Sequence, residues 1–174
     1  MGISEQWLDK RSVEWLVLTS RVMSDEVVQA DAAYLVGQTR DNASSVLERG
    51  AELWQKRLVT RLACQRGGDA AGYCGWDFSL RTLQILGVPP DAVVAVEARE
   101  TKPNTLTELV SLALLAKQSG WVRILLVASP FHQLRSFITA VTAANREHPS
   151  LRIYNCVGLP LPWNERVIHS QGVL

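Results

Sequence analysis

A short, nearly continuous apolar run at 122–128, set between two helical patterns, most constrains the fold of this chain. The run reads VRILLVA and shows no alternation of apolar and polar residues. A strand of this kind is typical of a parallel sheet, where both faces are buried. Before it, apolar residues recur at helical spacing from 106 to 116, and Gly120 follows. After it, Ser129 and Pro130 are typical of the first residues of a helix.

The same alternation extends over most of the chain. Strands are expected at 32–36, 59–64, 92–96, 122–128 and 151–157. Helices are expected between them, at 43–56, 78–86, 105–119 and 130–148. Strands and helices in strict alternation give a parallel sheet with right-handed crossovers. The sequence therefore predicts the α/β class, as a three-layer Rossmann-like domain with a mostly parallel five-stranded sheet and helices on both faces.

The length of 174 residues suits one domain with a full core, so 1–174 is predicted to be a single domain. Within the first 28 residues, a helix at 5–21 is expected to pack on the sheet. The segment 158–174 contains prolines and is expected to cross the surface as a tail, with Trp163 packed against the body.

Composition narrows the classes of function. Hydrophobic residues make up 47% of the chain and charged residues 20%, as in soluble globular proteins. The net charge of +1 gives no support to nucleic-acid binding. No apolar run approaches the roughly 18 residues of a membrane span. Three cysteines without CxxC spacing argue against a disulfide framework and against a zinc site. A cytoplasmic protein with free thiols and no metal is expected, and its oligomeric state stays open.

Several caps and faces are predicted from local patterns. Thr105 and Glu108 have the spacing of a capping box, which accounts for most of what Glu108 needs to do. Ser129, Asp77, and either Asp41 or Asn42 are expected to cap the other helices through their side chains. The core face of the helix at 130–148 is predicted to carry Phe131, Leu134, Phe137, Ile138 and Val141.

Polar residues gather after the expected strands, where α/β folds bind ligands. Gly37 and the polar turn to Asn42 lead into a helix start, a suitable place for an anion, although only Gly37 fits the dinucleotide fingerprint. Gly67 and Gly68 would allow close approach of a ligand, or would form a plain flexible loop. The ligand-binding candidates are Gly37, Gln38, Thr39, Asn42, Gly67, Gly68, Asn104, Thr105 and Ser129.

His132 and Arg135 are the sharpest catalytic candidates. They lie three residues apart on one helix face, near the helix start. A cation there opposes the helix dipole, and a bound phosphate or carboxylate would remove the conflict. The alternative interpretation is a solvated histidine beside a surface arginine, neither of which has a functional role. Glu100 is the third candidate, as an acceptor for ribose hydroxyls, or else as one partner of a surface ion pair.

Taken together these motifs resemble the YdcF-like family of bacteria, which includes SanA- and ElyC-type envelope proteins. The likeness covers about 29–157. Gln29-Ala30-Asp31 before the first strand, Gly67-Gly68 and Leu86-Gly87-Val88-Pro89 resemble recurring features of the family. Glu100-Thr101 with Asn104-Thr105 and Glu108, and the segment SPFHQLR at 129–135, resemble its two most specific motifs. The first turn has one glycine where many relatives have two or three, and the spacing ahead of Asn104 is altered.

The resemblance implies a Rossmann-like fold with a pocket at the strand ends. It makes S-adenosylmethionine a candidate ligand, and it supports Gly37, Gly67, Gly68, Glu100, Asn104, Thr105, His132 and Arg135 as pocket residues. The SanA and ElyC types carry a membrane anchor that this sequence does not show, which favours a cytoplasmic relative. The expected function is binding of an anionic, nucleotide-like or phosphorylated small molecule, with group transfer or hydrolysis using His132 as acid or base. The alternative is a non-catalytic ligand-sensing or partner-binding module on the same fold.

Overall fold

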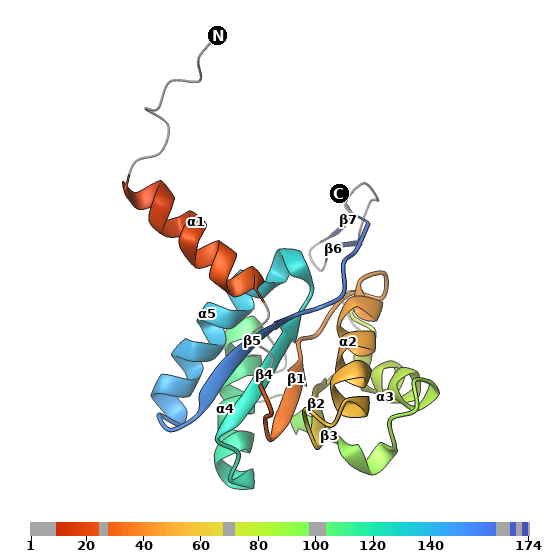
Figure 1. Cartoon of the computed structure of the whole chain (residues 1–174). Helices are drawn as coiled ribbons and strands as arrows, with labels where there is room; N and C mark the ends of the chain where they lie inside the picture. Colours follow the sequence, from red (N-terminus) through yellow and green to blue (C-terminus); the bar gives the residue numbers. More distant parts are fainter. Residues whose placement is uncertain are drawn as a thin grey trace.

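The computed structural model describes residues 10–24, 28–67, 72–97, 104–162, 168–169 and 172–173. Helices and strands alternate in the expected order (Figure 1). The helices are α1 (Lys10–Met23), α2 (Ala43–Gln55), α3 (Gly75–Ile85), the 3-10 helix η2 (Pro90–Ala92), α4 (Thr105–Ser119) and α5 (Pro130–Glu147). The strands of the main sheet are β1 (Ala32–Leu35), β2 (Arg61–Arg66), β3 (Val93–Glu97), β4 (Arg123–Ala128) and β5 (Arg152–Val157). In the tail, β6 (Ile168–His169) pairs with β7 (Gly172–Val173).

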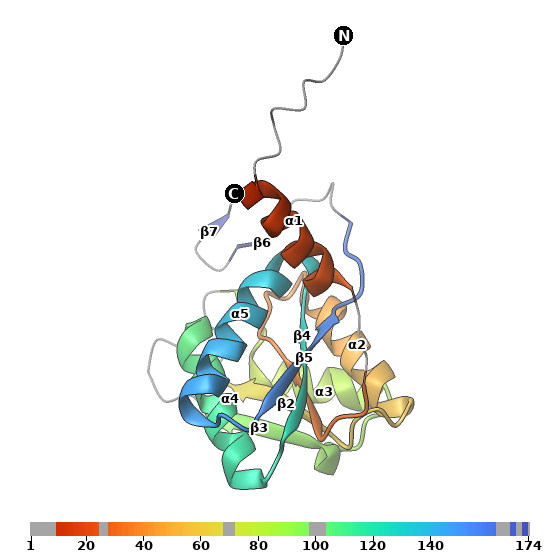
Figure 2. The ribbon, with the colours of Figure 1, turned by 60° about the vertical axis from the view of Figure 1, so that its left-hand side comes forward.

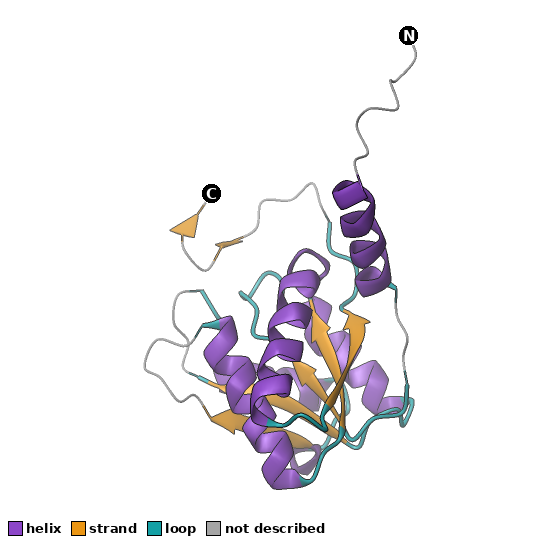
Figure 3. Ribbon diagram, turned by 90° about the vertical axis from the view of Figure 1, so that its left-hand side faces the viewer, coloured by secondary structure: helices purple, strands orange, loops and turns teal. Residues whose placement is uncertain are grey.

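The five main strands form one parallel sheet in the order β3-β2-β1-β4-β5. Helices α2 and α3 cover one face, and α4 and α5 cover the other, as Figures 1 and 3 show. This is the three-layer Rossmann-like fold that the sequence predicts. The chain builds outward from β1 to β3 and then crosses back to β4. The boundary between β1 and β4 is therefore the topological switch point, where such sheets open a crevice at the carboxyl ends of the strands.

The burial of the strands explains the missing alternation in their sequences. In β1, Leu35 faces the core under α2 and α3, while Tyr34 faces the core under α4 and α5. Residues 124–128 of β4 have no exposed surface at all. Because both faces of the central strands are covered, apolar residues are needed at every position.

The helix α1 meets the sheet mainly at its edge strand, β5. It begins at Lys10 within the described residues, contacts α5 and β5, and projects away from the body (Figure 2). Trp15 is 51% exposed and Leu16 is 59% exposed. Apolar residues occur nearly all around this helix, so the sequence did not define which face would contact the body. Residues 5–9 of the predicted helix and Trp163 lie outside the described residues.

The core face of α5 differs from the prediction. Phe131 and Ile138 are exposed, and Leu134 is only partly buried. Phe137 packs against the core as predicted. The buried residues of the face that meets α4 and the sheet are otherwise small or polar: His132, Gln133, Ser136, Ala140, Ala143 and Ala144. Small side chains let α5 approach its neighbours closely, whereas the predicted core face consisted of large apolar residues.

Helix ends are predicted in part. Gly87 (φ 86°) and Gly120 (φ 69°) adopt the left-handed conformation just after α3 and α4, as expected for helix-ending glycines. Asp77 does not cap α3, because the helix begins two residues earlier and Cys74 occupies the N-cap position. The strand expected at 59–64 lies at Arg61–Arg66. Its pairing with β3 continues to Arg66, which is opposite Glu97 at the end of β3.

Gly158 lies where the chain leaves the sheet between two other segments. Its amide donates to the carbonyl of Ala128 over 2.8 Å, and Leu159 donates to the carbonyl of Ser45 over 2.9 Å. A Cβ atom at 158 would lie 2.8 Å from the Ala128 oxygen and 2.5 Å from the Ser45 hydroxyl. The backbone at Ala128 cannot move away from such a Cβ atom without breaking the hydrogen bond from the Gly158 amide.

Replacing Gly158 by alanine is therefore expected to lower the free energy of unfolding by roughly 1–3 kcal/mol, as overpacking does elsewhere. Urea denaturation measures the change. Gly67→Ala is the matched control, since a Cβ at 67 would meet nothing within 4 Å. Equal midpoints for the two alanine variants would contradict the prediction.

All three cysteines, Cys64, Cys74 and Cys156, are buried and unbridged, as the odd count and spacing predict. Among the described residues, no helix combines the length and apolar character that crossing a bilayer requires.

Candidate functional site

Four of the predicted site residues, Gln38, Ser129, His132 and Arg135, meet at the switch point between β1 and β4. Leu35 at the end of β1 is in register with Val127 near the end of β4. The turn that begins at Gly37 therefore lies beside the start of α5 at Ser129 and Pro130. The order of strands in the sheet brings together two segments that are about ninety residues apart in the sequence.

Gln38 connects these two segments. Its Nε2 donates to the carbonyl of Val36 over 3.3 Å and lies 3.4 Å from Nδ1 of His132. Its Oε1 accepts from the hydroxyl of Ser129 over 3.0 Å. Ser129 occupies the N-cap position of α5 but does not cap it through its side chain, contrary to the prediction. Its hydroxyl instead fixes the amide of Gln38, which in turn orients the histidine ring.

His132 and Arg135 face each other as their spacing predicts. Nη2 of Arg135 lies 2.7 Å from Nε2 of His132, and His132 is only 8% exposed. The ring is therefore buried, so the interpretation of a solvated histidine is wrong. Arg135 itself is exposed. Its guanidinium thus connects the buried ring with the solvent at the start of α5.

The hydrogen-bond roles around His132 conflict. Arginine is always a donor, and the Gln38 nitrogen is also a donor because its amide orientation is fixed by Val36 and Ser129. A neutral imidazole offers only one acceptor nitrogen. Both ring nitrogens nevertheless face a donor, so a neutral ring can accept from only one of these two groups. If Gln38 keeps its bond to Nδ1, the proton resides on Nε2, on the side of Arg135.

Gln133 holds the start of α5 on the sheet and was not predicted as a site residue. It is fully buried. Its Oε1 accepts from the amide of Ala128 over 2.7 Å, and its Nε2 donates to the Leu126 carbonyl over 2.9 Å and to Oδ1 of Asn155 over 2.6 Å. A polar residue next to the two site candidates was the only signal in the sequence. The bonds of Gln133 set the position of the helix turn that carries His132.

Glu108 is not part of a capping box. The N-cap of α4 is Asn104, whose Oδ1 accepts from the amides of Leu106 and Thr107 over 3.0 and 3.1 Å. Thr107 completes that box, with its hydroxyl accepting from the Asn104 amide. Thr105 is the first helical residue. The capping pattern was shifted by one residue because Asn and Thr are both good N-cap residues.

The carboxyl group of Glu108 lies instead inside the fold, against β1. Its Oε1 accepts from the hydroxyl of Tyr34 and, over 3.3 Å, from the amide of Gly37. Burial raises the pKa of Glu108, and the hydrogen bonds from Tyr34 and Gly37 oppose that rise. Burial and the charge of Glu108 also raise the pKa of Tyr34 well above its ordinary value. Burial raises the pKa of nearby Cys64 to about 12, with further contributions from Cys74 and Glu108.

The turn after β1 is covered by the segment that follows β2. Thr39 bridges to Tyr73, the Arg40 amide donates to the Gly72 carbonyl over 3.2 Å, and the Cys74 thiol donates to the Gln38 carbonyl. Thr39 and Asn42 are 6% and 3% exposed. Asn42 occupies the N-cap of α2 without a side-chain cap bond, contrary to the prediction. The side chains of Thr39 and Asn42 are therefore buried beside the start of α2.

Of the three remaining predicted residues, Gly67, Gly68 and Glu100, the structure describes only Gly67. Gly67 directly follows β2, and its carbonyl accepts from the amide of Trp76 over 2.9 Å. Gly68 and Glu100 lie outside the described residues, so their roles stay predictions. Within the part of the chain that is described, no group of three or more histidine, cysteine, aspartate or glutamate side chains is arranged to hold a metal ion.

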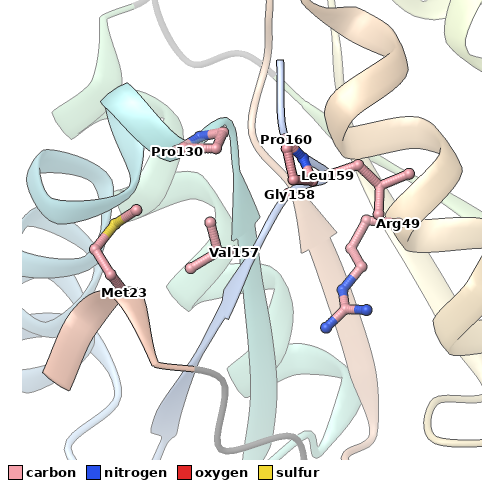
Figure 4. A pocket seen from close by; sticks show the side chains of 7 residues that line it. All are labelled: Met23, Arg49, Pro130, Val157, Gly158, Leu159 and Pro160. Carbon is pink, nitrogen blue, oxygen red and sulfur yellow. The ribbon is translucent and has the colours of Figure 1, made fainter. Parts of the chain in front are cut away.

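A cavity of about 400 Å³ opens beside the carboxyl end of β5, next to the start of α5 (Figure 4). Its lining comes from Met23, Arg49, Pro130, Val157, Gly158, Leu159 and Pro160. The Arg49 side chain bonds to Glu52 over 3.1 Å and to the sulfur of Cys156 over 3.3 Å. The guanidinium of Arg49 is thus paired with Glu52, and most of the other residues that line the cavity are apolar. None of the predicted site residues lines it.

In comparisons with known proteins, no family model, no curated protein and no solved structure matches the chain.

Proposed function

We propose that this chain is a YdcF-like protein that binds an anionic, nucleotide-like or phosphorylated small molecule at the carboxyl ends of β1 and β4. The donor conflict at His132 is the observation that carries the proposal. Arg135 and Gln38 both direct N–H groups at one imidazole. An anion between Arg135 and the ring accepts from both and removes the conflict. The start of α5 adds the positive end of the helix dipole at the same place.

His132 is the acid–base group in this proposal. Once Arg135 bonds to the anion, Nε2 of His132 is directed at the ligand, while Gln38 holds Nδ1. The ring then donates a proton to a leaving atom, or accepts one in the opposite protonation state. A phosphate ester would undergo hydrolysis or phosphoryl transfer. S-adenosylmethionine, whose carboxylate suits Arg135 equally well, would take part in group transfer. The buried free thiols are in keeping with a bacterial cytoplasmic location.

A thermal-shift panel tests the proposal. The compounds are S-adenosylmethionine, S-adenosylhomocysteine, nucleotides and sugar phosphates, applied to the wild type, His132→Ala and Arg135→Ala. A ligand at about 100 times its dissociation constant adds roughly 2.7 kcal/mol, which is about 5–10 °C for a domain of this size. Arg146→Ala is the matched control, since Arg146 lies exposed at the other end of α5. We expect a shift in the wild type and in Arg146→Ala that Arg135→Ala abolishes.

The outcomes separate the two functions. Turnover of the bound compound that disappears in His132→Ala while binding persists supports an enzyme. Binding that His132→Ala leaves unchanged, without turnover, favours the non-catalytic sensor. A shift that survives in Arg135→Ala would place the ligand elsewhere and contradict the proposed site.

A further inference from the structure

The carboxyl group of Glu108 has a place in this site that packing does not explain. Glu108 is 8% exposed, yet it extends from α4 toward the end of β1, the central strand. Two donors, the Tyr34 hydroxyl and the Gly37 amide, bond to the same oxygen, Oε1. One carboxyl oxygen is therefore held in place from two directions, and the orientation of the whole group is fixed.

The other oxygen, Oε2, receives no hydrogen bond from any of the described residues. A largely buried carboxyl group lowers the stability of the folded state when its two oxygens do not both accept hydrogen bonds. A side chain that served only to accept from Tyr34 and Gly37 could be the neutral amide of glutamine. The structure thus contains a firmly held acceptor oxygen to which none of the described residues donates.

Glu108 and His132 contact neighbouring residues of the turn after β1. The Gly37 amide bonds to Glu108, and the side chain of Gln38, the next residue, bonds to His132. Successive Cα atoms are about 3.8 Å apart, so the two groups flank one short turn. They approach it from different helices, α4 and α5, on the same side of the sheet. Glu108 and the pair of His132 and Arg135 therefore flank the same turn at the switch point.

We propose that Glu108 binds the ligand through Oε2, by accepting a hydrogen bond from a ribose hydroxyl, while Arg135 binds the ligand's anionic group. This inference rests on the proposed function and narrows its substrate class. The ligand must carry both an anion and a hydroxyl donor a few ångströms away, as nucleoside monophosphates and ribose phosphates do. Inorganic phosphate meets only the first requirement. Glu108 thus takes the role that the sequence analysis gave to Glu100.

Isothermal titration calorimetry with AMP, 2′,3′-dideoxy-AMP and inorganic phosphate tests the inference on the wild type, Glu108→Gln and Arg135→Ala. Glutamine keeps an Oε1 acceptor for Tyr34 and Gly37 but replaces Oε2 by a donor. We expect Glu108→Gln to weaken AMP about 10- to 100-fold, the range for a hydrogen bond to a charged group. The dissociation constants of 2′,3′-dideoxy-AMP and phosphate should change less than about twofold in Glu108→Gln. Arg135→Ala should weaken the binding of all three compounds.

Two controls keep the result interpretable. Tyr34→Phe removes a donor to Oε1 without touching Oε2, so it should weaken AMP less than Glu108→Gln does. The melting temperature of each variant, measured without ligand, shows that the domain is folded.

The failures are distinguishable. If AMP binds Glu108→Gln as tightly as the wild type but does not bind Arg135→Ala, the role of Glu108 is wrong and the anion site stands. If Glu108→Gln weakens 2′,3′-dideoxy-AMP as much as AMP, the contact is not to a ribose hydroxyl. If none of the three compounds binds the wild type, both the inference and the nucleotide class of the proposed function are wrong.

Discussion

Replacement of Gln133 by leucine is expected to lower the free energy of unfolding by about 3 kcal/mol or more, although the two side chains are similar in size. The amide of Gln133 is fully buried and bonds to Ala128, Leu126 and Asn155. Leucine removes all three bonds and leaves their polar partners next to an apolar group. A buried donor or acceptor that loses its partner costs roughly 1–3 kcal/mol. Denaturation in urea, followed by circular dichroism, measures the loss.

Gln118→Leu is the matched control for this result. Gln118 lies exposed near the end of α4, so the same chemical change there should alter stability by less than about 0.5 kcal/mol. The Gln133 variant should also weaken the ligand-induced shift, because the turn that carries His132 depends on the same bonds. A Gln133→Leu protein as stable as Gln118→Leu would show that α5 is held on the sheet by its apolar contacts alone.

The order of elements in this fold could be predicted because each signal is local. The apolar run of β4 and the glycines after α3 and α4 act within a few residues, and right-handed crossovers then leave few arrangements for the sheet. The face of α5 could not be predicted in this way. Phe131 and Ile138 lie at the spacing of a core stripe, but the close approach of α4 and β5 favours the alanines and Gln133 on that side. Which face is buried depends on neighbours that are distant in sequence.

The site shows the same division. The sequence placed His132 and Arg135 on one helix face, and their contact is confirmed. The link from Gln38 to His132 spans 94 residues, and the link from Tyr34 to Glu108 spans 74. No local pattern reports such pairs. Glu108 also had a sufficient local explanation, as a capping residue, which hid its actual role against β1. A buried carboxyl group is recognised only when its surroundings are known.

Raising the pH is expected to destabilise the wild type relative to Glu108→Gln. Burial raises the pKa of Glu108 in the folded chain above its value in the unfolded chain, about 4.3. Between these two pKa values the unfolded chain has lost the proton and the folded chain keeps it. The stabilising contribution of Glu108 is therefore fully present below the unfolded pKa and is lost as the pH rises through the folded pKa. Over that window the difference grows by up to about 1.4 kcal/mol per pH unit.

Urea denaturation of both proteins from pH 4 to pH 9 measures this difference, with Glu48→Gln on the exposed side of α2 as the control. Tyr34 and Cys64 do not interfere, because burial raises the pKa of each of them far above the window, that of Cys64 to about 12. The stability curves of the wild type and Glu48→Gln should stay parallel, while Glu108→Gln gains on both as the pH rises. A constant difference between Glu108→Gln and the wild type would mean that Glu108 titrates alike in the folded and unfolded chains. The carboxyl group would then be well solvated, and Glu108 would no longer stand out as a largely buried acid with one unbonded oxygen at the switch point.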